Sequence, residues 1–354
     1  MAIQTEPIGS IPRPRELLEA IEAFGSGSIS NEDLAARFDD AVRETIASLE
    51  GVGSPVVTDG EQRKPSFVTY PIDGLETLAP TGVAIPFADG HVRQLPSITA
   101  GPFRYRTYAG SYLEGAKPFT RRPLKQAVIS ASAMSLLYPA EGIDGYSRDA
   151  FLDDVVGEAE RDIRSCLEQG ADSVQIDFTE GRLSVKLDPS KGLLRSFVDL
   201  NNRVLARFSP EERARIGVHT CPGGDHDSTH SADIDYTELL PSLFEHQAGR
   251  FYIQLASEVD RPRVLRAIAE HSAPDQQIFV GVIDPIDPEI ESAEEVRDRV
   301  LEAAEFIPGA RLGTTDDCGF APFGDDAGTA RATAFEKIRA RIDGTKLAAA
   351  ELGL

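Results

Sequence analysis

The residue types best suited to chemistry are scarce in this chain, which has three cysteines and six histidines. His219 and Cys221 are two residues apart, and Cys318 follows much later in the sequence. Imidazole and thiolate are ligands that zinc prefers. Side chains at i and i+2 of an extended segment point the same way, so His219 and Cys221 could hold one ion. The alternative is a buried histidine with two inert core cysteines.

The composition limits which elements could position these residues. A chain of 354 residues allows two ordinary domains or one large barrel, and 41% hydrophobic residues support a core. The net charge of -22 disfavours nucleic acid and anionic membranes as partners. No apolar run is long enough to span a bilayer, and the N-terminus lacks the features of a secretory signal. Three cysteines do not form a disulfide framework, so we expect a cytoplasmic protein.

Short runs of β-branched and apolar residues predict strands, and most are separated by helical patterns. Ser292 and Glu295 form a capping box, an apolar stripe predicts a helix from Ser30, and residues 328–350 predict a terminal helix. This alternation predicts an α/β fold, a (β/α)8 TIM barrel in which residues 1–354 form one domain. A doubly wound open sheet is the alternative, but no glycine-rich phosphate fingerprint supports it. The predicted strands are residues 2–8, 55–58, 126–129, 173–176, 216–218, 251–253, 278–283 and 311–314.

Residues 71–122 interrupt the alternation after the second strand. They contain several prolines, and residues 84–93 and 104–112 alternate between apolar and polar types. We expect a β-hairpin insertion here, and an insertion of this length in a barrel loop is usually a lid or an oligomer contact.

The expected chemistry gathers at one end of the barrel, since active sites of this fold lie at the carboxyl ends of the strands. Cys166 differs, because it lies inside the predicted helix 153–169 and is expected in the core. This contrast favours a metal site at the rim. The rim residues are Ser10, Glu61, Asp177, His219, Cys221, Gln254 and Cys318.

Zinc held by two thiolates and one imidazole keeps one position open. A substrate thiol entering there would lose its proton and become a nucleophile. Water there would make a hydrolase or a deaminase, but the deaminase Cys-x-x-Cys pattern with its glutamate does not occur. The fourth ligand is left open between Gln254, Glu258 and none, and His226 or His230 could be a ligand or a proton donor.

The acids of the rim suggest an amino-acid substrate. Glu61 and Asp177 could bind its ammonium group, and Gly9 with Ser10 could bind its carboxylate. In the alternative reading Glu61 pairs with Arg63 or Lys64, and Asp177 caps a turn. Asp316 and Asp317 are expected to orient the metal ligands.

Taken together, these motifs resemble the catalytic barrel of the cobalamin-independent methionine synthase family, over nearly the whole chain. The resemblance implies zinc on His219, Cys221 and Cys318. It also implies homocysteine bound through Ser10, Glu61 and Asp177, with the two acids as catalytic residues. The methyl donor would be methylfolate or methylcobalamin, and the protein could be a homo-oligomer. The motifs are Ile8-Gly9-Ser10, Asp59-Gly60-Glu61, Val174-Gln175-Ile176-Asp177, His219-Thr220-Cys221, Gly281-Val282-Ile283-Asp284 and Asp317-Cys318-Gly319.

The sequence also departs from that family. Gln254 stands where the family has a ligating glutamate, Ile286 stands where it has a histidine, and the chain has no tryptophan to stack a folate. The departures leave alternatives beside methyl transfer to homocysteine. These are an epoxide:thiol alkyltransferase of the same family, a non-catalytic zinc or corrinoid-binding protein, and a metal-free uroporphyrinogen decarboxylase-like barrel.

Overall fold

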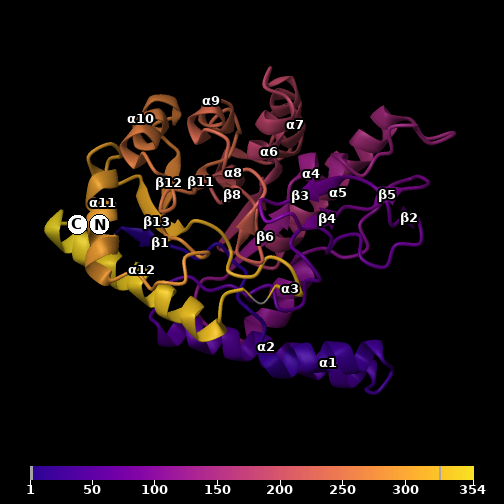
Figure 1. Cartoon of the computed structure of the whole chain (residues 1–354), viewed down its shortest axis with the longest axis horizontal. Helices are drawn as coiled ribbons and strands as arrows, with labels where there is room; N and C mark the ends of the chain where they lie inside the picture. The colour runs from indigo at the N-terminus through magenta and orange to yellow at the C-terminus, as the bar shows by residue number, and fades with distance from the viewer. Residues whose placement is uncertain (1–2, 327) are drawn as a thin grey trace.

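The computed structural model describes residues 3–326 and 328–354, and its centre is a curled parallel sheet (Figure 1). Seven strands lie in the order β1-β13-β12-β11-β8-β7-β6, and every neighbouring pair is parallel. The predicted strands after the second are confirmed within a few residues. The strands are β1 (Gln4–Thr5), β6 (Lys125–Ile129), β7 (Ser173–Asp177), β8 (Ile216–Thr220), β11 (Arg250–Ile253), β12 (Gln277–Ile283) and β13 (Leu312–Asp316).

The first two predicted strands are shorter than expected. The first was expected over residues 2–8, and of these Ala2 lies outside the described residues. Of residues 55–58 only Val57 pairs, through a single parallel bridge to Leu124 beside β6. The two margins of the sheet meet through isolated bonds, such as the Thr58 hydroxyl donating to the Gly9 carbonyl at 2.9 Å. The result is an α/β fold with a curled parallel half-barrel sheet.

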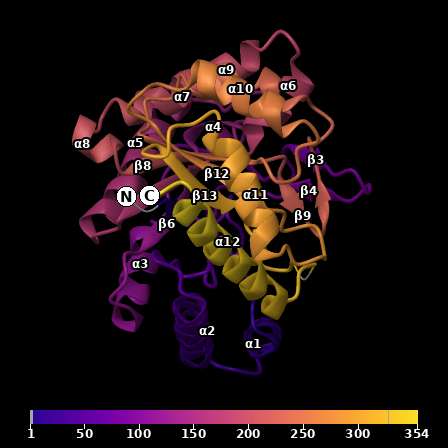
Figure 2. The same cartoon turned by 90° about the vertical axis from the view of Figure 1, so that its left-hand side faces the viewer.

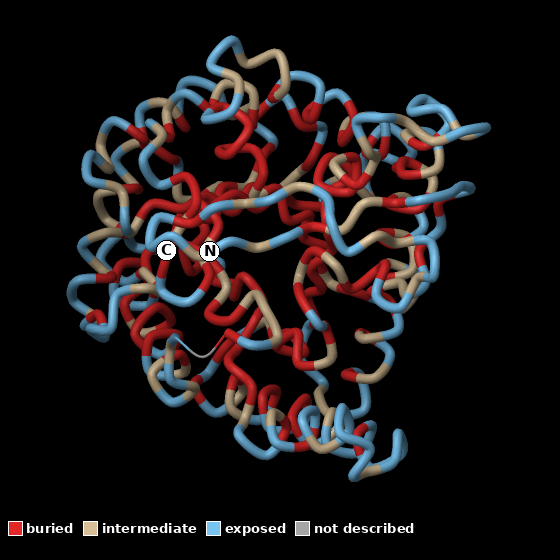
Figure 3. Tube along the Cα trace, turned by 45° about the vertical axis from the view of Figure 1, so that its right-hand side comes forward, coloured by how far each residue is buried: buried red, intermediate tan, exposed pale blue. Residues whose placement is uncertain are grey.

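Helices cover the outside of the sheet, and the buried part of the chain lies inside them (Figure 3). Capping boxes begin α2 at Ser30 and α11 at Ser292, as the sequence predicts, because each serine hydroxyl accepts the backbone N–H three residues later. Cys166 lies in α5 and is fully buried in the core, also as predicted. The longer helices are α1 (Arg15–Gly25), α2 (Asn31–Gly51), α5 (Arg148–Glu168), α7 (Gly192–Leu205), α10 (Arg261–His271), α11 (Ala293–Ala304) and α12 (Arg331–Glu351).

Two helix pairs pack side by side on the outside of the molecule. Helices α1 and α2 lie side by side with their own small apolar cluster, which includes Leu17, Ala20 and Leu34. Figure 2 shows this pair at the bottom of the molecule, with α11 and α12 packed together in front of the sheet. The shorter helices are α3 (Gly110–Ala116), α4 (Ala131–Ser135), α6 (Glu180–Leu187), α8 (Pro210–Arg213) and α9 (Leu240–Leu243), with single helical turns at Lys117–Phe119 and Tyr236–Glu238.

Residues 71–122 contain two short antiparallel pairs. Strand β2 (Leu78–Ala79) pairs with β5 (Ser97–Ile98), and β3 (Ala84–Pro86) pairs with β4 (Val92–Gln94). The alternation in residues 104–112 does not form a strand, because this segment leads into α3. A third small pair joins β9 (Gly224–Asp225) to β10 (Ser228–Thr229) after β8.

Among the described residues, no helix is both long enough and apolar enough to cross a bilayer.

Candidate functional site

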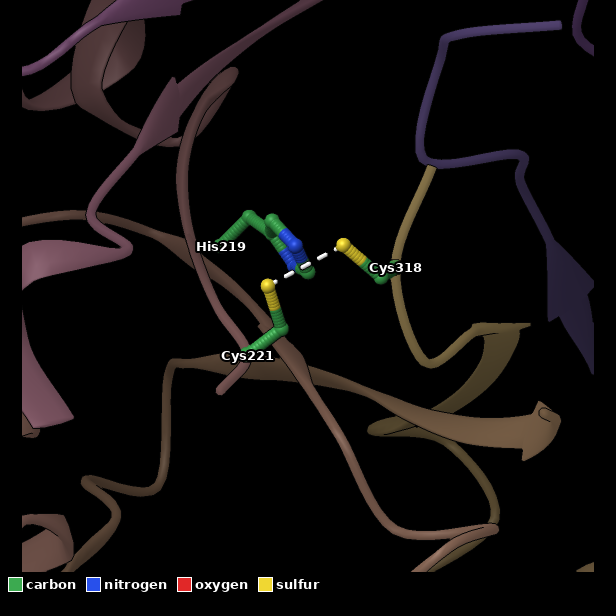
Figure 4. A group of neighbouring side chains, drawn as sticks. All are labelled: His219, Cys221 and Cys318. Atoms are coloured by element: carbon green, nitrogen blue, oxygen red, sulfur yellow. Dashed lines mark hydrogen bonds between the residues drawn. The ribbon is translucent and has the colours of Figure 1, made fainter. Parts of the chain in front are cut away.

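The two predicted thiol ligands come from strands that are not neighbours in the sheet. Cys221 directly follows β8, and Cys318 lies just after β13, with β11 and β12 between those two strands. The curl of the sheet nevertheless brings the two sulfur atoms to 3.1 Å (Figure 4). Possible ligand atoms of His219, Cys221 and Cys318 all lie within 4.8 Å of one another. The structure therefore brings together three of the four residues predicted as metal ligands.

His219 is oriented to offer one nitrogen to this cluster. Its Nδ1 lies 3.3 Å from the carbonyl oxygen of Tyr252, so Nδ1 carries the proton in that bond. Its Nε2 is buried and has no hydrogen-bond partner among the described residues. The ring points toward the sulfurs in Figure 4. A buried nitrogen with a free lone pair fits a metal ligand, since leaving it unpaired costs free energy.

The surroundings of the sulfurs also fit a cation. The backbone N–H of Gly223 donates to the Cys221 sulfur at 3.4 Å. The contact with Cys221, together with burial, raises the pKa of the Cys318 thiol well above its usual value. The Cys318 sulfur can therefore be a thiolate at neutral pH only beside a compensating positive charge. One imidazole nitrogen and two thiolates form a donor set of the kind that binds zinc at a catalytic site.

Gln254, the fourth predicted ligand, is held elsewhere. Its amide oxygen accepts a hydrogen bond from Arg182 at 3.1 Å, and its amide nitrogen donates to the hydroxyl of Ser257 at 2.6 Å. Glu258 pairs with the same arginine at 2.8 Å. Gln254 and Glu258 line a smaller cavity, whereas His219 and Cys318 line the main one. The physical reason for this difference from the sequence prediction is the buried guanidinium of Arg182, which attracts both side chains.

The three residues expected to bind an amino acid all line the main cavity, together with His219 and Cys318. Glu61 accepts a hydrogen bond from Lys64 at 2.8 Å, so the ion pair that the sequence offered as an alternative is present. The backbone of Glu61 has a φ of 57°, and Gly60 before it has a φ of 68°. This tight turn presents the carboxylate to the cavity. The Ser10 hydroxyl accepts from the backbone N–H of Ala321 at 3.2 Å.

Asp177 ends β7 and is the register partner of His219 on β8. Its carboxylate accepts a hydrogen bond from Gln175 at 2.7 Å. Burial raises the pKa of Asp177 to about 6, and the nearby carboxylate of Glu61 acts in the same direction. A positively charged group between Asp177 and Glu61 would relieve this repulsion.

The loop after β8 covers the cluster closely. Gly223 has a φ of 72°, and a Cβ atom there would lie 1.8 Å from Nε2 of His230. His230 is buried, and burial lowers its pKa to about 4, so its ring is neutral at physiological pH. His226 lies farther out, near Asp225 and Asp326, and is not part of the cluster of sulfurs.

Within the described part of the chain, Asp316 and Asp317 form no hydrogen bond to the side chains of the metal-ligand candidates, but they fix the strand end that carries Cys318. Asp317 accepts from the backbone N–H groups of Leu255, Ala256 and Ser257, each at 2.8 Å. Asp316 forms a buried ion pair with Arg341 of α12. These contacts anchor the backbone next to Cys318, and a role of the two residues in orienting the metal ligands stays a prediction.

The sequence analysis did not single out Glu180, a buried acidic residue of the cavity that begins α6. Its carboxylate accepts hydrogen bonds from the hydroxyls of Ser130 and Ser132, and the other oxygen has no partner among the described residues. Burial raises the pKa of Glu180 to about 7. In the sequence, only the position of Glu180 could have indicated this role: it lies three residues after the end of β7, which ends at the rim.

The main cavity has a volume of about 820 Å³, which is in the range of ligand sites in proteins. Its inner end is formed by His219, Cys318 and the three substrate-binding candidates. Its outer part is mainly apolar and reaches α1, α2 and the pair β3–β4.

Comparisons with known proteins agree over nearly the whole chain. Residues 3–337 match the family described as the cobalamin-independent synthase, catalytic domain. The curated methionine synthases of Saccharolobus islandicus and Saccharolobus solfataricus are 23% and 24% identical, and each match covers 99% of this chain and 96% of the relative. The structure is similar to a B12-independent methionine synthase from a Shewanella species, solved with selenomethionine, with a TM-score of 0.77 at 19% identity and 99% coverage of both chains. A Listeria monocytogenes protein described as a putative vitamin-B12 independent methionine synthase gives a TM-score of 0.72 at 21% identity and 98% coverage of both chains.

Proposed function

Because the chain belongs to the cobalamin-independent synthase family, matched through its catalytic domain, we propose that it transfers a methyl group to the thiol of homocysteine at a zinc ion held by His219, Cys221 and Cys318. As a member of this family the chain is an enzyme of the methyltransferase class. The observation that carries the proposal is the buried set of one free imidazole nitrogen and two sulfurs, of which His219 and Cys318 line the inner end of a large cavity.

The protein's own residues would bind and orient homocysteine. Asp177 and Glu61 would hold its ammonium group, and Ser10 would lie near its carboxylate, so that the thiol enters beside Cys318. Zinc bound at the site would supply the positive charge that keeps this thiol ionised at neutral pH. His219 would keep its proton on Nδ1, bound to the Tyr252 carbonyl, which leaves Nε2 free for the metal. Gln254 is left out of the proposed ligand set, because Arg182 already holds its oxygen.

We also propose how the barrel is closed and what the segment 71–122 does. Residues 1–354 would form one closed barrel domain, with the segment around Val57 as its eighth strand, and residues 71–122 would form a lid. Two features support the lid. Ile85 and Phe87 line the cavity, and Arg93 of β4 pairs with Asp325 at 2.9 Å across its mouth.

Metal analysis tests the ligand set. We expect about one zinc per chain, lost in Cys221→Ser and in Cys318→Ser and kept in Cys166→Ser, the matched control in the core. Absence of zinc in protein purified without chelator would contradict the assignment, as would a requirement for Cys166.

A donor screen tests the reaction. Zinc-loaded protein is incubated with homocysteine and methylfolate, methylcobalamin or a small epoxide, and the products are identified by mass spectrometry. Methionine from one of the methyl donors is the expected result. If a thioether forms only from the epoxide, the protein is an epoxide:thiol alkyltransferase instead of a methyltransferase. If no donor gives a product, the result favours a non-catalytic binding protein.

A further inference from the structure

The main cavity is much larger than homocysteine needs. Its outer part is mainly apolar, unlike the inner end with its acids and sulfur. We call this part the outer chamber. It lies between the helix pair α1–α2, the strand β3, the segment 61–73 that precedes β2, and the segment 318–325 that follows β13. Its apolar walls are Leu18, Ile21, Leu34, Phe38, Ile85, Phe87 and Phe323. A second substrate that meets the thiol at the inner end must pass through or occupy this space.

Two arginines that line the cavity are already engaged by the protein. Arg13 donates to the backbone carbonyls of Phe323 at 3.2 Å and of Glu61 at 3.1 Å. Arg63 pairs with Asp39, and its guanidinium lies 5.5 Å from the centre of the Phe38 ring. Neither side chain is free to serve as the counter-ion of a bound anion.

The other two cations of the cavity wall are engaged in the same way. Lys64 donates to Glu61 at 2.8 Å and to the carbonyl of Ala127 at 2.9 Å. Arg93 binds Asp225 at 2.9 Å and Asp325 at 2.9 Å. All four lysine and arginine side chains of the wall thus have acidic or carbonyl partners.

Carboxyl groups outnumber these cations in the wall. Glu61 and Asp325 are paired, whereas Glu22 and Asp73 are exposed and form no ion pair within the described part of the chain. Within the described residues, the carboxylate of Asp177 accepts a side-chain hydrogen bond only from Gln175. An anionic group that enters the outer chamber would exchange water for apolar walls, engaged cations and the unpaired carboxylates of Glu22 and Asp73, which costs free energy.

We infer that the outer chamber binds an uncharged, mainly apolar second substrate and rejects one that carries an anionic tail. The inference depends on the proposed function in one respect: the ligand of the outer chamber is taken to be the alkyl donor. The apolar walls provide the binding free energy. The discrimination comes from the wall cations, since no lysine or arginine of the wall is free among the residues that the structure describes.

Binding of two matched fluorescent probes tests the inference without turnover. One probe is a methoxynaphthyl methanol, which is neutral, and the other is the corresponding methoxynaphthoate, which is an anion of nearly the same shape. We expect the neutral probe to bind at least roughly tenfold more tightly at low salt, a difference of about 1.4 kcal/mol. The gap should narrow as salt rises, because exposed charges are screened.

A charge placed at the chamber wall locates the binding site. Ile21 lines the cavity and is 37% exposed, so Ile21→Lys should fold and should reduce the preference for the neutral probe several-fold. Ile290→Lys is the matched control, because Ile290 is 48% exposed and does not line the cavity. It should leave the preference unchanged.

Three results would overturn the inference: equal or tighter binding of the anion, binding of neither probe, or equal effects of the two lysine variants. Homocysteine methylation is measured separately with mono- and triglutamyl methylfolate. If methylation occurs and the triglutamyl donor is the better one, the inference fails while the proposed function stands. If no donor is used but the neutral probe binds with the expected preference, the proposed function fails and the chemistry of the chamber stands.

Discussion

The two ring nitrogens of His219 have different roles in the structure. Nδ1 faces the Tyr252 carbonyl, and Nε2 is left without a partner in a buried place. A free buried nitrogen is destabilising unless something binds it. A buried nitrogen without a partner lowers folding stability, and such locally unfavourable groups are typical of functional sites.

The acids of the cavity should decide which thiols are accepted. Charge-assisted hydrogen bonds to an ammonium group contribute about 1.5–3 kcal/mol each. Asp177→Asn and Glu61→Gln should therefore each weaken homocysteine binding by roughly tenfold or more, without loss of zinc. Calorimetric titration with homocysteine measures the first effect, and metal analysis measures the second.

A thiol without an amino group is the control for this prediction. The reaction of 2-mercaptoethanol should change little in either variant. If it loses as much activity as homocysteine does, the two acids serve the second substrate or the fold instead.

At the scale of elements, the metal-ligand cluster depends on the loop that joins β8 to β9. Gly223 donates its N–H to the Cys221 sulfur and has a positive φ, and a side chain there would collide with His230. Gly223→Ala should lower zinc affinity about tenfold, since a left-handed backbone and a clash each cost on the order of 1–2 kcal/mol. A competitive titration against a chelator measures this loss.

Gly224→Ala is the matched control for that loop. A Cβ atom at Gly224 would lie 3.8 Å from Ile286 and 3.9 Å from the Cys318 sulfur, which is ordinary contact. Equal zinc affinities in the two variants would contradict the role given to Gly223.

Periodicity and capping residues predicted most of the elements, because both are local. The strands that end at Asp177 and before Cys221 follow from runs of apolar residues, and α11 follows from Ser292 with Glu295. Residues 55–58 form only one bridge, at Val57, because pairing depends on how the two margins of the sheet approach each other.

The parts of the site that escaped prediction depend on distant partners. Gln254 follows a strand as the pattern requires, but Arg182 from α6 takes its oxygen. Glu180 matters through Ser130 and Ser132, which lie in and before α4. Local spacing in the sequence does not predict such contacts between distant residues. The i, i+2 spacing of His219 and Cys221 is local, and it predicts directly that both side chains point the same way.

At the scale of the whole molecule, Glu180 should make folding stability depend on pH. Its pKa is raised to about 7 in the folded state by burial, above the unfolded value of about 4.3. The folded state therefore binds more protons in this window, so stability falls as pH rises from about 4 to above 7. Glu180→Gln should remove this loss and be more stable than the natural protein at pH 8 by about 1–3 kcal/mol, with little difference near pH 4.

Urea denaturation at the two pH values measures this difference. Glu270→Gln is the control, because Glu270 is exposed on α10 and should leave the pH dependence unchanged. A Glu180→Gln protein whose stability falls between pH 4 and pH 8 as steeply as that of the natural protein would show that the buried carboxyl is not the source.

The central claim is that the cation site takes up the homocysteine sulfur as a thiolate, and proton release on binding tests it most directly. Homocysteine is titrated into zinc-loaded protein by calorimetry, at neutral pH, in buffers of different ionisation enthalpy. The slope of the observed heat against that enthalpy gives the number of protons released. We predict about one proton per chain, and none in Cys318→Ser. Heats that are the same in all buffers, with homocysteine bound, would contradict the account.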